Sequence, residues 1–316
     1  ALNQTYQNIE LIILDSKSSD GSVEIIKSYN DPRIRFYPNN ENEGCYGNCN
    51  KLISLAKGEF IAFLHTDDFY APTFLEEIVN AYRENPDKKV FHSIMCKVDM
   101  GLNSVIPCCP FKSSGVKSQK EVLISLAFDN TIGNGMSVVM HKDCIKEVGV
   151  FDNQFRYAAD YDMFMRLAKK YEFVYIHKPL AFYRLHSANL TNSVYLEMIK
   201  QGHRICNKNF KDSGIISKDL QKQLLANQWD SMILKAYYIG LKYRSKKLTE
   251  DLIEFYCETY PEFSHKKNRF SYLMPLLDLA LKSNFTNSIT AFLLRLGKLY
   301  KTQVSGNTQK ILVKAN

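Results

Sequence analysis

The stretch GEFIAFLHTDDFYAPTFLEEI, residues 58–78, decides the fold class. Its apolar run, residues 61–64, is typical of a buried strand, and the segment that begins around Pro72 is typical of a helix. Between them stand two adjacent carboxylates, Asp67 and Asp68. Because like charges at neighbouring positions repel each other, this pair predicts a positively charged group between the two acids.

Strand-like and helix-like segments alternate on both sides of this stretch. Short apolar or alternating runs at residues 9–14, 33–38 and 88–99 indicate strands. Helical spacing at residues 44–56, and capping residues before the first expected helix, indicate the intervening helices. Strands that alternate with helices predict β-α-β units and a largely parallel sheet.

Acidic residues follow two of the expected strands. Asp15 ends the first strand, and Asp67 and Asp68 end a later one. In open α/β sheets a ligand lies beyond the carboxyl ends of the strands. We therefore expect these acids to project into one ligand-binding crevice.

The pattern changes near residue 195. Residues 197–300 show helical spacing with few strand signals, so we expect an α/β domain at 1–195 and a mainly helical region at 196–316. Residues 201–316 carry 19 Lys and Arg against 9 Asp and Glu, a net charge of +10, whereas the rest of the chain has −2. This positive charge predicts that the region binds an anionic membrane surface or another phosphate-rich partner. The alternative is that the charged residues form a solvated helical face. We expect no nucleic-acid partner.

The composition, 45% apolar and 23% charged, is that of a soluble globular protein. A run of about 18 apolar residues does not occur, so the sequence predicts no membrane span. Eight cysteines are scattered without a C-x-x-C pair or a zinc-like spacing with histidine, which indicates free thiols in a reducing compartment. We expect a cytoplasmic protein that can lie at the inner face of a membrane.

Four segments carry a family resemblance, in this order: QTYQNIELIILDSKSSDGS (4–22), NEGCYGNCNKLISLAKGEFIAFLHTDD (42–68), IGNGMSVVMHKDCIKEVGVFD (132–152) and AADYDMFMRLAKKYEFVYIHKPLAFYRLH (158–186). Together they resemble the family 2 glycosyltransferases of the GT-A fold. The resemblance covers residues 2–192 and implies an α/β domain with a Rossmann-like mixed sheet. Members begin with one more strand, so we expect residues 1–195 to lack the first strand of the nucleotide pocket.

The resemblance implies a divalent-cation site. Asp68 would be a direct ligand of Mn²⁺ or Mg²⁺, whose preference for carboxylate oxygens fits this residue, and His186 would complete the site. Asp67 would reach the ribose or the donor sugar. The alternatives are an Asp-Asp turn that caps the helix at Pro72 and a purely structural histidine.

The resemblance also implies a nucleotide-binding set, consisting of Asp15, Ser16, Asn42, Gly44 and Asn50. Asp15 matches an acid that contacts the base, and its carboxylate can accept the N3–H of uracil. Ser16 stands where members have a second acid, and Asn48 stands where they often have arginine. A capping role is the alternative for Asp15.

Asp160 matches the general base of inverting members. It is expected at a helix start, where the helix dipole favours the charged carboxylate, so burial must raise its pKa for useful proton uptake. Asp162 is the competing candidate, and a capping role for Asp160 is the remaining alternative.

Two functions from different classes remain open. The first is an inverting, metal-dependent glycosyltransferase that moves a sugar from a nucleotide-diphospho-sugar, with UDP-sugars favoured, to a glycan or lipid-linked glycan in polysaccharide biosynthesis. The second is a non-catalytic nucleotide-sugar-binding or assembly protein. The expected lack of a first strand favours it, as do Ser16, Asn48 and Ala159, the last of which stands where members often have glutamate. The presence of Asp67, Asp68 and Asp160 favours the enzyme.

Overall fold

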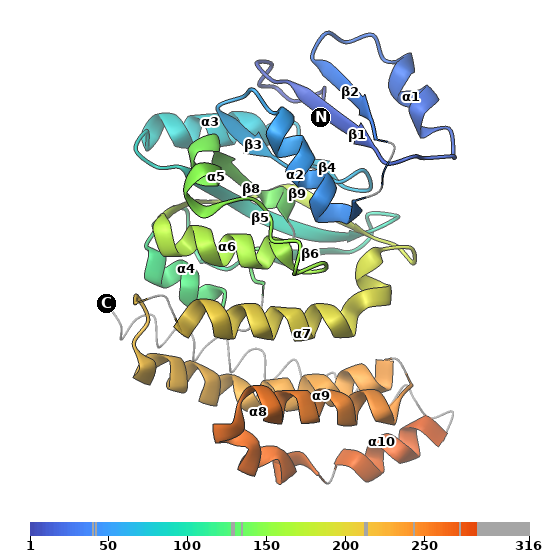
Figure 1. Cartoon of the computed structure of the whole chain (residues 1–316), viewed down its shortest axis with the longest axis vertical. Helices are drawn as coiled ribbons and strands as arrows, with labels where there is room; N and C mark the ends of the chain where they lie inside the picture. The colour runs from blue at the N-terminus through green and yellow to red at the C-terminus, as the bar shows by residue number, and fades with distance from the viewer. Residues whose placement is uncertain are drawn as a thin grey trace. The chain divides into compact units, whose positions relative to one another are not determined.

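The computed structural model of the chain separates into two compact units, Ala1–Asn209 and Phe210–Asn316 (Figure 1). The structure describes residues 1–39, 41, 43–127, 130–133, 135–211, 214–242, 244–271 and 273–282. The expected boundary at 195/196 lies inside helix α7 (Leu190–Lys211). The assignment of a domain to each side of that boundary stays a prediction.

The described strands of the first unit form two sheets. The smaller one pairs β1 (Leu11–Asp15) with β2 (Ile34–Pro38). The larger one has the order β3-β8-β5-β9-β4, with β6 beside β5 and β7 beside β9. Its strands are β3 (Phe60–Ala62), β4 (Phe69–Tyr70), β5 (Val90–Asp99), β6 (Val105–Cys108), β7 (Gly115–Lys117), β8 (Val138–His141) and β9 (Phe173–Leu185).

The larger sheet is mixed, as the family resemblance implies. Among the described strands β1 and β2 pair in parallel, as do β5 and β9, and every other pairing is antiparallel. The expectation of a largely parallel sheet was therefore wrong. One reason is local, because β5 and β6 are joined by a short turn closed at Asp99 and Ser104, and a short turn can join only antiparallel neighbours.

Glu10, directly before β1, connects the two sheets. Its carboxylate accepts the main-chain N–H groups of Lys57 at 2.6 Å and Gly58 at 2.7 Å, which lead into β3. It also forms an ion pair with Arg35 on β2. Glu10 therefore fixes the start of the small sheet against the start of β3.

Helices flank the larger sheet (Figure 1). Those of the first unit are α1 (Ser22–Ser28), α2 (Gly44–Leu55), α3 (Phe74–Glu84), α4 (Gln119–Ser125), the 3-10 helix η1 (Gly135–Ser137), α5 (Lys142–Val148), α6 (Ala159–Lys170) and α7. The apolar spacing of α3 shows why it packs where it does: Phe74, Ile78 and Ala81 lie on one face and are buried. They pack with Phe91 of β5 and Val174 of β9.

Strand β5 is the centre of this core. Val90 and Phe91 are fully buried, and the strand lies between β8 and β9. Burying a side chain the size of phenylalanine contributes about 1.5–3 kcal/mol relative to leaving it exposed. The core therefore gives a rigid base for the loops that leave β3, β8 and β9.

The described part of the second unit is helical, as expected. It contains α8 (Lys218–Lys242), α9 (Lys246–Thr259), the 3-10 helix η2 (Pro261–Phe270) and α10 (Leu273–Lys282). Trp229 and Tyr256 are buried, and the Ser245 side chain caps α9 by accepting the N–H of Leu248. In the part of the chain that the structure describes, no helix is long and apolar enough to span a membrane.

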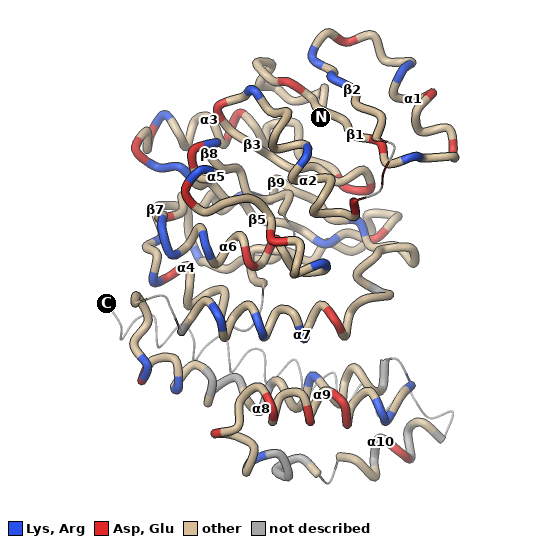
Figure 2. The backbone as a smooth tube through the Cα atoms, in the orientation of Figure 1, with Lys and Arg blue, Asp and Glu red and all other residues tan. Residues whose placement is uncertain are grey.

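The basic charge of the C-terminal region is unevenly placed along the sequence. Both acidic and basic residues occur along α8 and α9 (Figure 2), and in α9 two lysines at the start are followed only by acidic residues. Residues 283–316 instead carry five Lys and Arg and no Asp or Glu. This last segment, which includes ITAFLLRLGKLY (289–300), lies outside the described residues.

Candidate functional site

The two adjacent acids lie in the turn between β3 and β4. Asp68 is 7% exposed, and its Oδ1 accepts the main-chain N–H of Arg184 at 2.9 Å. This contact follows from the pairing of Phe69 on β4 with Phe182 on β9. Arg184 is the cationic residue beside the acids, but its Nε donates to the main-chain oxygen of Asp67 rather than to a carboxylate.

Asp67 faces the end of β9. Its Oδ2 lies 3.1 Å from Nε2 of His186. Asn189 fixes this histidine, because its Oδ1 accepts the main-chain N–H of His186 at 2.6 Å and its Nδ2 lies 3.1 Å from the same Nε2. Asn189 was not singled out from the sequence, although a polar residue three positions after a histidine at a strand end indicates such a turn.

Asp67, Asp68 and His186 can hold a divalent cation only in part. Among the described residues there is no group of three or more His, Cys, Asp or Glu arranged to hold a metal by itself. Mg²⁺ in nucleotide sites usually takes one or two carboxylates from the protein and further ligands from phosphates and water. The side chains present fit that kind of site, since Asp67 is 40% exposed and its carboxylate is accessible.

The nucleotide-binding set lies around the end of β1 and the start of α2. Oδ2 of Asp15 accepts the N–H of Ser18 at 3.0 Å, which is a turn-capping contact. Oγ of Ser16 accepts from Nδ2 of Asn48 at 2.8 Å, so the two residues that depart from the family pattern contact each other. Gly44 begins α2 with φ of 77°, a conformation that favours glycine.

Asn50 has a structural contact. Its amide both donates to the carbonyl of Phe151 and accepts the N–H of Phe151, each at 2.9 Å. Asn42 lies outside the described residues. Nucleotide binding by Asp15, Ser16, Asn42, Gly44 and Asn50 stays a prediction.

Asp160 lies in the first turn of α6 and is half-buried. Its Oδ1 accepts the phenol of Tyr46 at 2.9 Å and the N–H of Tyr161 at 2.8 Å, while Oδ2 lies 3.4 Å from Nδ2 of Asn130. Burial raises the pKa of this carboxyl, and the Tyr46 hydrogen bond and the His65 charge partly oppose that rise. A carboxylate with a raised pKa and an accessible oxygen can accept a proton from a substrate hydroxyl.

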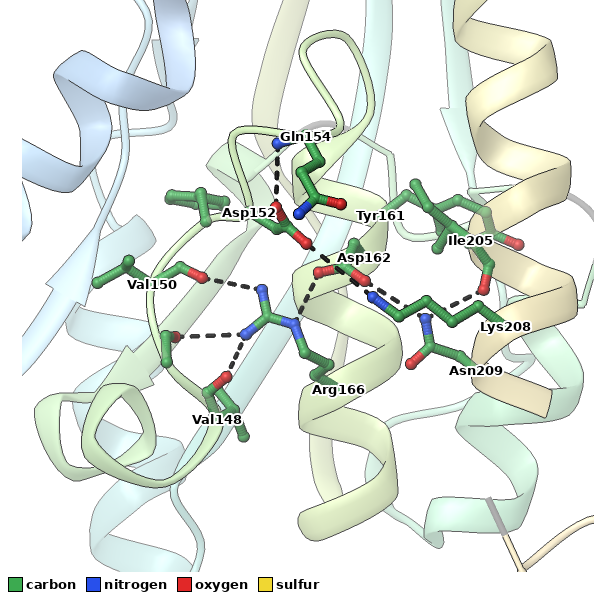
Figure 3. A network of polar contacts seen from close by, with 12 residues as sticks. Val148, Val150, Asp152, Gln154, Tyr161, Asp162, Arg166, Ile205, Lys208 and Asn209 are labelled. Carbon is green, nitrogen blue, oxygen red and sulfur yellow. Dashed lines mark hydrogen bonds and ion pairs between the residues drawn. The ribbon is translucent and has the colours of Figure 1, made fainter. Parts of the chain in front are cut away.

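Asp162, the competing candidate for the base, has a different environment (Figure 3). It is 1% exposed and its Oδ2 accepts from Nε of Arg166 at 2.7 Å. Its Oδ1 lies 3.4 Å from Nδ2 of Asn209 on α7. Because Asp162 is buried and both of its oxygens contact side chains of the protein, a substrate cannot easily reach it, so the geometry favours Asp160.

Arg166 also fixes the loop between α5 and α6 (Figure 3). Its guanidinium donates to the carbonyls of Val148, Gly149 and Val150, in the last case at 2.9 Å. The next residue, Phe151, packs its ring against Tyr46 of α2 at 5.3 Å between centroids. One guanidinium on α6 therefore orders the loop that supports both Asn50 and Tyr46.

Asp67 and Asp160 act on the same side chains, whereas a common crevice for Asp15, Asp67 and Asp68 stays a prediction. Burial lowers the pKa of His65, and both Asp67 and Asp160 act against that change. The pKa of Cys45, lowered mainly by its hydrogen bond with Cys49, likewise responds to both acids. Asp67 and Asp160 are therefore close enough to influence the same two side chains.

Comparisons with known proteins agree with this architecture. Residues 1–107 match the family described as Glycosyl transferase family 2. An uncharacterized glycosyltransferase of Rickettsia typhi is 29% identical over 195 residues, which cover 61% of this chain and 60% of the relative. Escherichia coli WfaP, a UDP-Glc:alpha-D-GlcNAc-diphosphoundecaprenol beta-1,3-glucosyltransferase, is 42% identical over 93 residues, covering 29% of this chain and 36% of WfaP.

The match thus spans about 60% of the length of the first curated relatives. Among solved structures, S. aureus TarS 1–349 in complex with UDP-GlcNAc has a TM-score of 0.61. That alignment covers 99% of this chain and 86% of TarS 1–349 at 14% identity. At this identity the likeness shows the fold.

Arg166→Ala should lower the free energy of unfolding by about 3–5 kcal/mol, because it leaves the buried Asp162 carboxylate without its cation. Urea denaturation of the chain, monitored by circular dichroism, measures this loss of stability. The matched control is Lys208→Ala, which removes a 4.0 Å ion pair with Asp152 whose lysine is 57% exposed, and should cost about 0–1 kcal/mol. Equal losses in the two variants would contradict a structural role for the Asp162–Arg166 pair.

Proposed function

We propose that the first unit of this chain is a family 2 glycosyltransferase domain of the GT-A fold, since residues 1–107 match that family and the fold resembles that of TarS. It would transfer a sugar from a nucleotide-diphospho-sugar to a glycan or lipid-linked glycan, with inversion at C1. The observation that carries the proposal is the convergence of Asp67 and Asp160 on His65. In this arrangement Asp67 would serve the donor and Asp160 the acceptor hydroxyl.

A UDP-sugar is the favoured donor. The Escherichia coli relative is named for UDP-Glc, and the structural neighbour was solved with UDP-GlcNAc. Asp15 supports this choice chemically, since a carboxylate at the end of β1 can accept the N3–H of uracil. The proposal of a lipid-linked acceptor rests on the same relative, which is named for a diphosphoundecaprenol-linked acceptor.

Asp160 would act as the general base. As the acceptor oxygen attacks C1 from the face opposite the diphosphate, its proton passes to the carboxylate and the bond to the diphosphate breaks. Oδ2 is the suited atom, because Oδ1 already accepts two hydrogen bonds. Asp67, Asp68 and His186 would hold Mn²⁺ or Mg²⁺, and a bound cation stabilises the negative charge that develops on the leaving diphosphate.

Asp160→Asn tests the proposed function. The amide cannot take up the proton, so kcat should fall by about 10²–10⁴ while the affinity for the donor stays nearly unchanged. A panel of UDP-sugars, with release of UDP as the readout, identifies the donor first and then supplies kcat and KM. Asp162→Asn is the comparison, and an inactive Asp162→Asn beside a near-normal Asp160→Asn would assign the base to Asp162.

Asp68→Asn tests the proposed cation site. Loss of one carboxylate should abolish Mn²⁺-dependent binding of UDP, because the protein supplies few ligands of its own and each one matters. Isothermal titration with UDP, with and without Mn²⁺ and after EDTA, measures this. If Asp68→Asn binds UDP with full affinity, and EDTA does not change that affinity, Asp68 is not a ligand of the cation.

We also propose that the C-terminal region contacts an anionic membrane surface, with the protein on its cytoplasmic face. Each Lys or Arg close to such a surface contributes about 1 kcal/mol before screening, and residues 283–316 carry five without an acid. The full chain should therefore co-sediment with phosphatidylglycerol vesicles at low salt and be released as salt rises. A chain that ignores these vesicles, or one whose binding survives deletion of residues 283–316, would contradict this role.

A further inference from the structure

Tyr46 links the helix on the nucleotide side of the site to the proposed base. It lies in the first turn of α2, and its phenol donates to Oδ1 of Asp160, 114 residues further along the chain, at 2.9 Å. We propose that Tyr46 is a positioning residue of the transfer reaction, whose phenol holds Oδ1 of Asp160 so that Oδ2 is left to take the acceptor proton. The inference rests on the proposed function, since it takes Asp160 to be the base.

The phenol can act as a constant donor. Burial raises the pKa of Tyr46 well above its ordinary value, and the negative charge of Asp160 raises it further. Tyr46 therefore keeps its proton throughout the working pH range. A hydrogen bond to the charged form of a carboxylate favours that form, so the contact lowers the pKa of Asp160 while burial raises it.

The ring of Tyr46 is held in place from the side. Phe151 packs against it at 5.3 Å between centroids, and Phe63 packs against Phe151 at 5.4 Å. The Asn50 amide fixes the main chain of Phe151. Arg166 fixes the preceding residue, Val150, through its carbonyl. Since Arg166 and Asp160 lie on the same helix, α6 carries both the base and the group that orders the base's positioning residue.

Other groups face Asp160 as well. They are Cys45 and Cys49 on α2, His65 after β3, and the Asn130 amide. The thiols act by charge when they ionise, and a protonated His65 lowers the pKa of Asp160. Tyr46 differs from these in its short, directed contact with one oxygen, which sets the orientation of the carboxylate as well as its charge.

Tyr46→Phe removes the hydroxyl and keeps the ring that packs against Phe151. The pKa of Asp160 should rise by about one unit, because the charged carboxylate loses a hydrogen bond. Carbon-13 NMR of labelled aspartate carboxyls measures this without substrate, with Asp160→Asn to assign the signal. In the pH profile of kcat for UDP release, the acid limb should move to higher pH by the same amount. At pH values below the pKa of Asp160, kcat should therefore fall about tenfold, while KM changes by less than about twofold.

Tyr82→Phe is the matched control. Its hydroxyl lies on α3, 3.4 Å from Glu59, and its removal should leave the pKa of Asp160 and the acid limb unchanged. Phe151→Leu gives a second measurement, since it keeps the phenol but removes the ring that packs against it. It should shift the pKa of Asp160 in the same direction by a smaller amount.

The outcomes separate this inference from the proposed function. If Asp160→Asn is inactive but Tyr46→Phe matches the unaltered chain in both the pKa of Asp160 and the acid limb, the positioning role of Tyr46 is overturned and the base assignment stands. If Asp160→Asn keeps its kcat, the base assignment fails, and a shifted pKa in Tyr46→Phe would then reflect a contact without catalytic consequence. A Tyr46→Phe variant whose kcat falls equally at every pH, without a shift of the limb, also overturns the inference.

Discussion

The ion pair between Asp162 and Arg166 is the interaction on which the site depends. It neutralises a carboxylate that is 1% exposed, and the same guanidinium satisfies carbonyl groups of Val148 and Val150 in a loop without regular structure. Hydrogen bonds from a charged donor are stronger than those between neutral groups, so Arg166 holds this loop at a fixed position. Because Phe151 comes next, its contacts with Asn50 and Tyr46 depend on this one side chain.

Two carboxylates on one turn of α6 thereby acquire different chemistry. Asp162 has a cationic partner and serves the fold. The side chains that donate hydrogen bonds to Asp160, those of Tyr46 and Asn130, are neutral. Burial raises the pKa of Asp160, which suits the proposed role of this carboxyl as the base. Environment rather than residue type separates the two roles.

Much of the fold could be predicted from the sequence, because apolar periodicity and capping residues are local properties. Strands at 11–15, 34–38 and 90–99 and the helix at 44–55 lie within a residue or two of the segments expected for them. The relative direction of the strands does not follow from local sequence, because the antiparallel pairs β3–β8 and β4–β9 join segments that are far apart in the chain. Periodicity contains no information on which of two distant strands become neighbours.

The residues of the proposed site could be named from the sequence, whereas the residues that contact them could not. Family motifs pointed to Asp160, but they left Asp162 open, although an arginine four positions after Asp162 is a local signal for an ion pair on one helix face. Tyr46 and Asn189 were missed, since a tyrosine in a first turn and an asparagine after a strand have many uses. Only the spatial approach of α2 to α6, and of β9 to the turn after β3, gives them a role.

The Glu10 carboxylate has a consequence for binding affinity. It fixes one end of the small β1–β2 sheet to the segment before β3, while the other end of β1 carries Asp15. The apolar residues of β1 are only partly buried, unlike those of β5, so the small sheet is expected to open locally at a lower free energy. A nucleotide sugar that contacts Asp15 and Asp67 together must hold the two sheets at one separation. Part of its interaction free energy is then used to order the protein, and the measured affinity is weaker than the contacts alone would give.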